Sequence, residues 1–251
     1  MFLVLSAIEV FVPLQEIYCY FACLITEGIY QKKMSIVEKY KKIQSQLSAD
    51  VRLVVVSKFQ PETAMMELYK AEQRVFGENR VQEITEKHER LPKDIEWHFI
   101  GHLQTNKVKY ILPFTVLIHG VDSFRLLEEI NKCAGKIGKI QDCLLQIHIA
   151  REETKFGFSF QELDEILMSG KIESLKNIRI CGLMGMASFV DDERIVRQEF
   201  HSLSQYFRKI KEKYFFDSKY FKELSIGMSG DYPIAIEEGA TMVRIGSSIF
   251  K

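Results

Sequence analysis

The chain has 251 residues, which is enough for one large α/β domain or two smaller ones. Its formal net charge is zero, and no basic stripe with interleaved aromatic residues stands out, which argues against a nucleic-acid-binding role. Hydrophobic residues make up 47% of the chain and charged residues 27%, as in a soluble globular protein with a sizeable core. The five cysteines have no metal-ligand spacing, and they indicate reduced thiols in a cytoplasmic protein.

The first 33 residues differ in composition from the rest. Residues Met1–Ile29 are rich in apolar and aromatic residues and contain no Lys or Arg, and three glutamates interrupt them. The uncharged stretch Ile17–Thr26 is too short to span a bilayer, and a secretory signal would need a basic leader and an unbroken apolar centre. We interpret residues 1–33 as an extension introduced by the gene model, with translation starting at Met34. An additional docking helix is the alternative.

From residue 35 onward, helical and strand-like segments alternate. The first is an amphipathic helix at Ser35–Leu47. Eight apolar runs predict strands at Leu53–Ser57, Arg74–Gly77, Trp97–Gly101, Val116–His119, Cys143–Ile149, Ile178–Met186, Glu223–Met228 and Met242–Gly246. Segments between them have helical periodicity and a polar face, for example Pro61–Gln73, Val81–Arg90, Phe124–Ile137, Phe160–Met168 and Glu193–Tyr214.

These eight repeats show no break in composition, so they predict one α/β domain, residues 34–251, with an all-parallel sheet. Length and repeat number favour a closed (β/α)₈ barrel of the TIM type over a doubly wound open sheet. Residues Gly182–Gly185 lack the spacing of a dinucleotide-binding turn.

Lys58 ends the first apolar run, just before Pro61. Side chains alternate along a strand, so Val54, Val56 and Lys58 are expected on one face. An ammonium carried into a sheet interior needs compensation, either from a partner anion or from a lowered pKa that permits covalent chemistry on a carbonyl. A lysine that leaves the strand end for solvent is the alternative interpretation.

The last two strands end in a pattern that predicts a phosphate site. Glycines at 227, 230 and 246 let backbone N–H groups approach an anion, and Ser229 and Ser247 can donate hydroxyl hydrogen bonds. A helix that begins near Asp231 adds the positive end of its dipole. Phosphate sites of barrels often lie after strands seven and eight. Ordinary Gly/Ser turns remain the alternative.

Arg244 shares a strand face with Met242 and Gly246. If that face points inward, the guanidinium is buried and requires an acceptor, whereas an arginine paired with a glutamate at the surface is the alternative. An inward arginine opposite an inward lysine, beside a phosphate site, suits pyridoxal phosphate. Arginine cannot accept a proton, so it would leave the pyridine nitrogen unprotonated and the ring a weaker electron sink.

Five motifs in order resemble the pyridoxal phosphate homeostasis protein family (the YggS type), namely Val56–Lys58, Phe76–Glu83, Trp97–Lys107, Ser225–Asp231 and Val243–Phe250. The resemblance runs from about Met34 to Lys251. It implies a barrel like the alanine racemase N-terminal domain (pyridoxal phosphate fold type III), with pyridoxal 5′-phosphate as a Schiff base on Lys58. It also implies the other cofactor-binding residues, which are Asn79, Ser229, Arg244, Gly246 and Ser247.

The chain departs from the family pattern in three places. His102 stands where many relatives carry proline, and the chain stops at Lys251, where relatives usually continue with glycine and arginine. The N-terminal extension has no counterpart in the pattern. None of these departures removes an expected cofactor contact.

Other residues are weaker candidates. Lys155 also follows a strand, but it lies in a polar loop where solvent favours its charged form, and Lys107 is expected on a solvent-facing helix. Histidines in or beside different strands are expected to be satisfied core or loop residues, not zinc ligands, namely His98, His102, His119 and His148. Further residues are assigned to packing or helix capping, namely Cys181, Met184, Met186 and the acidic run Asp191–Glu193.

The resemblance and the residues together predict a binding protein that holds the cofactor as an internal aldimine and buffers or delivers it inside the cell. Racemases of this fold draw a second acid–base residue from an additional β-domain of a partner subunit, for which this chain has no residues left. We therefore expect no dedicated catalysis and no metal, nucleic-acid or membrane partner. Apo forms of pyridoxal phosphate enzymes are the expected recipients. We expect a monomer, with a weak dimer as the alternative.

Two enzyme classes remain as alternatives. A pyridoxal phosphate-dependent amino-acid racemase of the same barrel class is the first. A barrel enzyme acting on a phosphorylated sugar, without pyridoxal phosphate, is the second.

Overall fold

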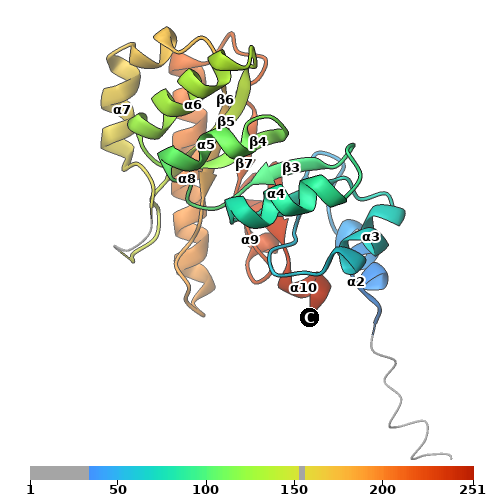
Figure 1. Cartoon of the computed structure of the whole chain (residues 1–251). Helices are drawn as coiled ribbons and strands as arrows, with labels where there is room; N and C mark the ends of the chain where they lie inside the picture. The colour runs from blue at the N-terminus through green and yellow to red at the C-terminus, as the bar shows by residue number, and fades with distance from the viewer. Residues whose placement is uncertain (1–33, 153–155) are drawn as a thin grey trace, which may run out of the picture. The chain divides into compact units, whose positions relative to one another are not determined.

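The computed structural model describes residues 34–152 and 156–251. Its core is a closed barrel of eight parallel strands in sequence order, which confirms the predicted (β/α)₈ architecture (Figure 1). The strands are β1 (Arg52–Val56), β2 (Val75–Glu78), β3 (Glu96–Phe99), β4 (Thr115–Val121), β5 (Gln141–Ile147), β6 (Ile178–Gly185), β7 (Glu223–Ser225) and β8 (Met242–Ile245). Barrel closure places β8 between β1 and β7.

The strand register brings the ends of β1 and β8 to the same level. Leu53 pairs with Val243 and Val55 pairs with Ile245, so Val56 and Gly246 follow side by side. All strands are parallel, so every segment that follows a strand emerges at the same rim of the barrel. Lys58 and the segment from Gly246 onward therefore leave neighbouring strands at this rim.

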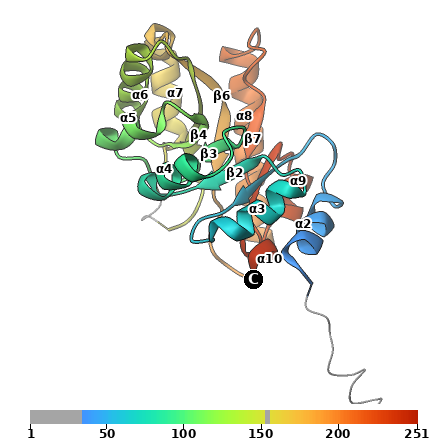
Figure 2. The same ribbon diagram turned by 45° about the vertical axis from the view of Figure 1, so that its right-hand side comes forward.

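Helices surround the strands (Figures 1 and 2). The first and last described helices, α2 and α10, pack against each other. The α-helices are α2 (Ile36–Gln44), α3 (Glu62–Lys70), α4 (Val81–Arg90), α5 (Val108–Ile111), α6 (Phe124–Lys136), α7 (Phe160–Met168), α8 (Glu193–Tyr214), α9 (Tyr232–Glu237) and α10 (Ser247–Phe250). Two short 3₁₀ turns complete the set, η1 (Thr105–Lys107) and η2 (Lys171–Ser174).

The apolar core has two layers. The larger one lies between the strands and the helices and contains, among others, Trp97, Phe99 and Leu224. A smaller cluster lies among the inward-facing residues of the barrel and consists of Val54, Leu117, Leu144, Cys181, Met184 and Met242. The assignment of Cys181 and Met184 to packing is confirmed, because both are buried in this inner cluster.

Element boundaries differ from the sequence prediction at the seventh strand. It was expected to reach Met228, but β7 ends at Ser225 because Gly227 adopts φ +89°, a left-handed conformation that interrupts an extended strand. Asp192 caps α8 as expected, since its side chain accepts a hydrogen bond from the Arg194 backbone. The prediction for residues 1–33 concerns a segment outside the described residues. Among the helices that the structure does describe, none has the length and apolar character needed to cross a membrane.

Candidate functional site

Lys58 lies at the rim, two residues beyond the end of β1. The predicted burial of its ammonium is wrong, because the strand stops at Val56 and the Lys58 residue is exposed. Within the described part of the chain its side chain makes no hydrogen bond or ion pair. The amine is therefore accessible to a molecule that enters from the rim.

The segments after β7 and β8 meet around one hydroxyl oxygen. The backbone N–H groups of Gly246 and Ser248 both lie 3.3 Å from the Oγ of Ser229, and the Ser248 hydroxyl donates to the Ser229 carbonyl over 3.3 Å. Backbone N–H groups that converge on one oxygen are also how proteins hold phosphate. We refer to Ser229, Gly246, Ser247 and Ser248 as the serine cup.

The serine cup corrects the sequence analysis in two details. Ser248 makes the contacts with Ser229, while Ser247 is exposed at the start of α10. Ser248 was missed because it occupies the one variable position of the quoted motif. Gly230 has no steric need to be glycine, since a Cβ atom there would meet open space.

Gly246 has a clear reason to lack a side chain. A Cβ atom at this position would lie 2.9 Å from the Val56 carbonyl oxygen on β1. Gly246→Ala should therefore push the serine cup away from β1 and weaken phosphate binding about tenfold, the value of one hydrogen bond to a charged group. Isothermal titration of the purified protein with inorganic phosphate measures this, and equal affinities for variant and wild type would contradict it.

Arg244 is buried in the barrel, as expected from its strand face, with 3% exposure. Its Nη1 donates to the backbone carbonyl and the Oγ of Ser225, each over 2.7 Å, and its Nη2 donates to the Gly185 carbonyl over 2.9 Å. Burial lowers the pKa of this guanidinium to about 10, and the Asp231 carboxylate opposes the shift, so the group is charged at neutral pH. Its Nε has no acceptor within the described residues and remains available to a ligand.

A chain of buried groups continues from Arg244 across the barrel. Ser225 Oγ lies 3.0 Å from His119 Nδ1, and His119 Nε2 lies 3.0 Å from His98 Nδ1. Burial lowers the pKa of both histidines, that of His98 to about 3, so both rings are neutral at pH 7. This confirms the expectation that they are hydrogen-bonded core residues.

The direction of these hydrogen bonds follows from Arg244, which can only donate. Ser225 Oγ accepts from Arg244, and its own hydrogen points to His119 Nδ1. His119 therefore carries its proton on Nε2 and donates to His98 Nδ1. The reverse direction would leave both the Ser225 hydroxyl and His98 Nε2 without partners, whereas this one leaves only the His98 Nε2–H group, which is buried without a partner in the described chain.

Asn79 follows β2 and is half-buried, and its Oδ1 is a buried acceptor without a donor among the described residues. Such a group is rare in a folded protein, and it fits an atom supplied by a ligand. The weaker candidates lie elsewhere. Lys107 is exposed as predicted, His148 Nε2 contacts the Glu152 carbonyl at 2.9 Å, and Lys155 lies outside the described residues.

His102, a departure from the family pattern, lies at the same rim. Its Nδ1 is 2.6 Å from Asp122 Oδ2, and its ring stacks on Phe156 with 3.9 Å between ring centroids. The other expected roles of histidine also hold, since no cluster of potential metal ligands occurs in residues 34–152 and 156–251.

Comparison with known proteins identifies the family. The sequence profile "Alanine racemase, N-terminal domain" matches residues 33–251. A pyridoxal phosphate homeostasis protein of Aquifex aeolicus is 42% identical over 200 residues, which cover 79% of this chain and 86% of the relative. This chain belongs to the pyridoxal phosphate homeostasis protein family. The family member of Synechocystis is 37% identical over 84% of this chain and 95% of its own length.

A solved structure of the same family supports the assignment. PipY of Synechococcus elongatus, determined with pyridoxal phosphate bound, is 33% identical and superposes with a TM-score of 0.78. The match covers 86% of this chain and all of PipY. The two curated relatives are named for cofactor homeostasis and not for a reaction, as the resemblance implied. Family membership and the barrel are therefore settled, while the roles of individual residues follow from the geometry above.

Proposed function

We propose that this protein binds pyridoxal 5′-phosphate covalently on Lys58 and serves as a reserve of the cofactor for other proteins. The observation that carries the proposal is the convergence of three groups at neighbouring strand ends. They are the free amine of Lys58 after β1, the serine cup after β7 and β8, and the buried guanidinium of Arg244.

The residues present fit this cofactor on their own chemistry. Pyridoxal phosphate supplies an aldehyde carbon that bonds to a primary amine. Lys58 provides that amine, the N–H groups of Gly246 and Ser248 point at an oxygen as they would at a phosphate, and Arg244 keeps Nε for the ring nitrogen. Asn79 offers the unpartnered Oδ1. Arg244 is a donor only, so it holds the ring nitrogen without protonating it, which suits storage better than catalysis.

Several finer assignments belong to the same proposal. The protein acts in the cytoplasm on residues 34–251, with the apo forms of pyridoxal phosphate enzymes as recipients. It does so as a monomer or a weak dimer. PipY, whose printed description includes the bound cofactor, supports the ligand class for this chain.

Mass spectrometry of the intact protein, before and after borohydride reduction, tests the covalent assignment. Reduction fixes the bond between the lysine nitrogen and the aldehyde carbon, so one cofactor per chain should become permanent and map to the peptide that contains Lys58. Recovery on Lys155 would overturn the site. Saturated protein that stays colourless and gains no mass would overturn the covalent proposal, and rapid turnover of D- or L-amino acids would favour the racemase.

A further inference from the structure

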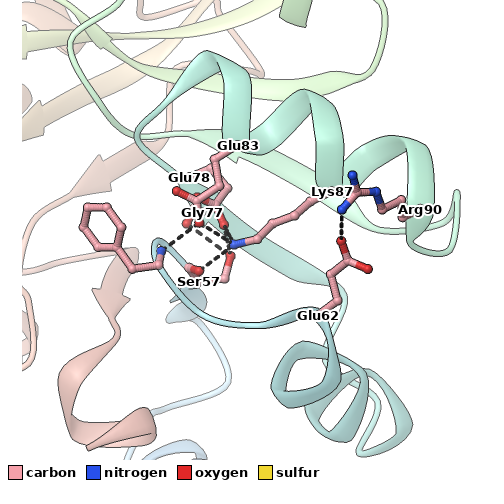
Figure 3. Close-up of polar contacts among 8 residues, drawn as sticks. Ser57, Glu62, Gly77, Glu78, Glu83, Lys87 and Arg90 are labelled. Carbon is pink, nitrogen blue, oxygen red and sulfur yellow. Dashed lines mark hydrogen bonds and ion pairs between the residues drawn. The ribbon is translucent and has the colours of Figure 1, made fainter.

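We infer that Lys87 is a positioning residue for Lys58, an inference that rests on the proposed covalent role of Lys58. Lys87 extends from α4 toward the end of β1, and its side chain is 7% exposed (Figure 3). Its Nζ lies 2.8 Å from the Ser57 carbonyl oxygen, 2.8 Å from Glu78 Oε1 and 2.7 Å from Glu83 Oε1. An ammonium has three N–H donors, so these three contacts use all of them.

The acceptors of Lys87 hold the backbone on both sides of Lys58. Ser57, the preceding residue, is held by its carbonyl and also by its hydroxyl, which donates to Glu78 Oε1 over 2.6 Å. Phe59, the following residue, is held through Glu83, whose Oε1 accepts the Phe59 N–H over 2.7 Å. One buried ammonium therefore connects both neighbours of Lys58.

The turn that these contacts hold is strained. The Ser57 carbonyl accepts the Gln60 N–H over 3.0 Å, which makes residues 57–60 a β-turn with Lys58 and Phe59 at its centre. Phe59 has φ +62°, a conformation that glycine or asparagine adopts much more readily. Its side chain is 62% exposed, so core packing does not enforce this conformation. The hydrogen bond to Glu83 is the contact that does.

Lys58 itself contributes nothing to its own placement. It lies beyond β1, is exposed, and its amine has no partner in the described segments. The direction of the amine therefore depends on the backbone of the turn. The turn in turn depends on the cluster formed by Ser57, Glu78, Glu83 and Lys87.

This placement matters for one chemical step. The unprotonated Lys58 Nζ attacks the aldehyde carbon, a C=N bond forms, and the carbonyl oxygen leaves as water, with no electrons exchanged. Losing the hold on the turn adds backbone freedom that must be lost again before the bond can form. Contacts with the phosphate and the ring come from β7 and β8 and do not pass through Lys87.

Two ligands separate this role from a general loss of structure. Pyridoxal phosphate can bond to Lys58, whereas pyridoxine 5′-phosphate has an alcohol in place of the aldehyde and uses only the remaining contacts. In the full chain, Lys87→Met should weaken pyridoxal phosphate binding about tenfold or more, because the turn is no longer fixed. Affinity for pyridoxine phosphate should stay within about twofold, the change left by a substitution that touches none of its contacts. Isothermal titration measures both, and borohydride trapping with intact mass reports the covalent fraction.

A matched control lies three residues further along the same helix. Arg90 Nη1 contacts Glu62 Oε1 at 3.2 Å, and the Arg90 side chain is 63% exposed (Figure 3). Arg90→Met also removes a cation and an ion pair from α4, and both affinities should match wild type. Phe59→Asn, placed in the Lys87→Met background, should restore part of the covalent fraction, because asparagine tolerates the left-handed conformation without the hold.

Lys87→Met leaves the Glu78 carboxyl buried without its cation. Burial already raises the pKa of Glu78, and the hydrogen bonds from Lys87 and Ser57 oppose that shift. If this variant does not fold, Glu83→Ala replaces it, since it frees the Phe59 N–H and leaves the Lys87–Glu78 pair intact. The same selective loss is then expected.

Equal losses for both ligands, or no loss for either, would overturn the positioning role of Lys87. A wild-type protein that loads no cofactor on Lys58 would instead overturn the proposed function, and this inference with it. The two failures are distinguished by the wild-type sample alone.

Discussion

Arg244→Ala should weaken pyridoxal phosphate binding roughly 10- to 150-fold, which corresponds to the loss of about 1.5 to 3 kcal/mol for a hydrogen bond from a charged donor. The absorbance band of the bound cofactor should also shift, because the ring nitrogen loses the donor that faces it. Fluorescence or absorbance titration of the purified variant gives the affinity, and the spectrum of the saturated protein gives the shift.

A comparison variant separates the ring contact from the interior network. Ser225→Ala removes one of three acceptors of Arg244, but the carbonyls of Ser225 and Gly185 still hold the guanidinium. We expect its spectrum to stay close to wild type while its stability falls by about 1 to 3 kcal/mol, since the His119 Nδ1 loses its donor. An Arg244→Ala protein with unchanged affinity and spectrum would show that Arg244 is structural only.

The free energy of unfolding should fall steeply as the pH drops below 6.5. His98 and His119 have lowered pKa values in the folded protein, that of His98 about 3. Between pH 6.5 and about 3 the unfolded chain binds a proton on His98 and the folded chain does not. Each such histidine then contributes about 1.4 kcal/mol of lost stability per pH unit. Above pH 6.5 neither state binds the proton, and this contribution is constant.

Urea unfolding of the protein at pH 6.0 and pH 5.0 measures this slope. His98→Gln removes one titrating ring while its side-chain oxygen can accept the hydrogen bond from His119. Its stability should therefore change less with pH, by about 1.4 kcal/mol per pH unit. Parallel slopes for variant and wild type would mean that His98 is protonated in the folded barrel.

Much of the fold could be predicted from periodicity, because each of the eight strands is an apolar run between polar helices. The buried position of Arg244 followed from the same alternation, since Met242 and Arg244 share a face. Short elements were harder. The helix α5 has four residues, too few for a helical period, and the end of β7 depends on the backbone conformation of Gly227.

The predictions that failed depend on contacts between distant segments. The burial of Lys58 was inferred from strand alternation, but alternation stops where the strand stops, and the end of β1 is fixed by a turn. Lys87 looked like one more polar residue of an amphipathic helix. Its role becomes visible only when α4 is placed beside β1, because its partners come from three separate segments. Ser225 and Ser248 were missed for the same reason.

The open position of Lys58 has a practical consequence for work with the purified protein. Any small primary amine in the solution can reach the same aldehyde carbon and displace the lysine nitrogen. Tris, glycine and ammonium salts should therefore strip the colour from loaded samples, and storage in phosphate-free, amine-free buffer should preserve it.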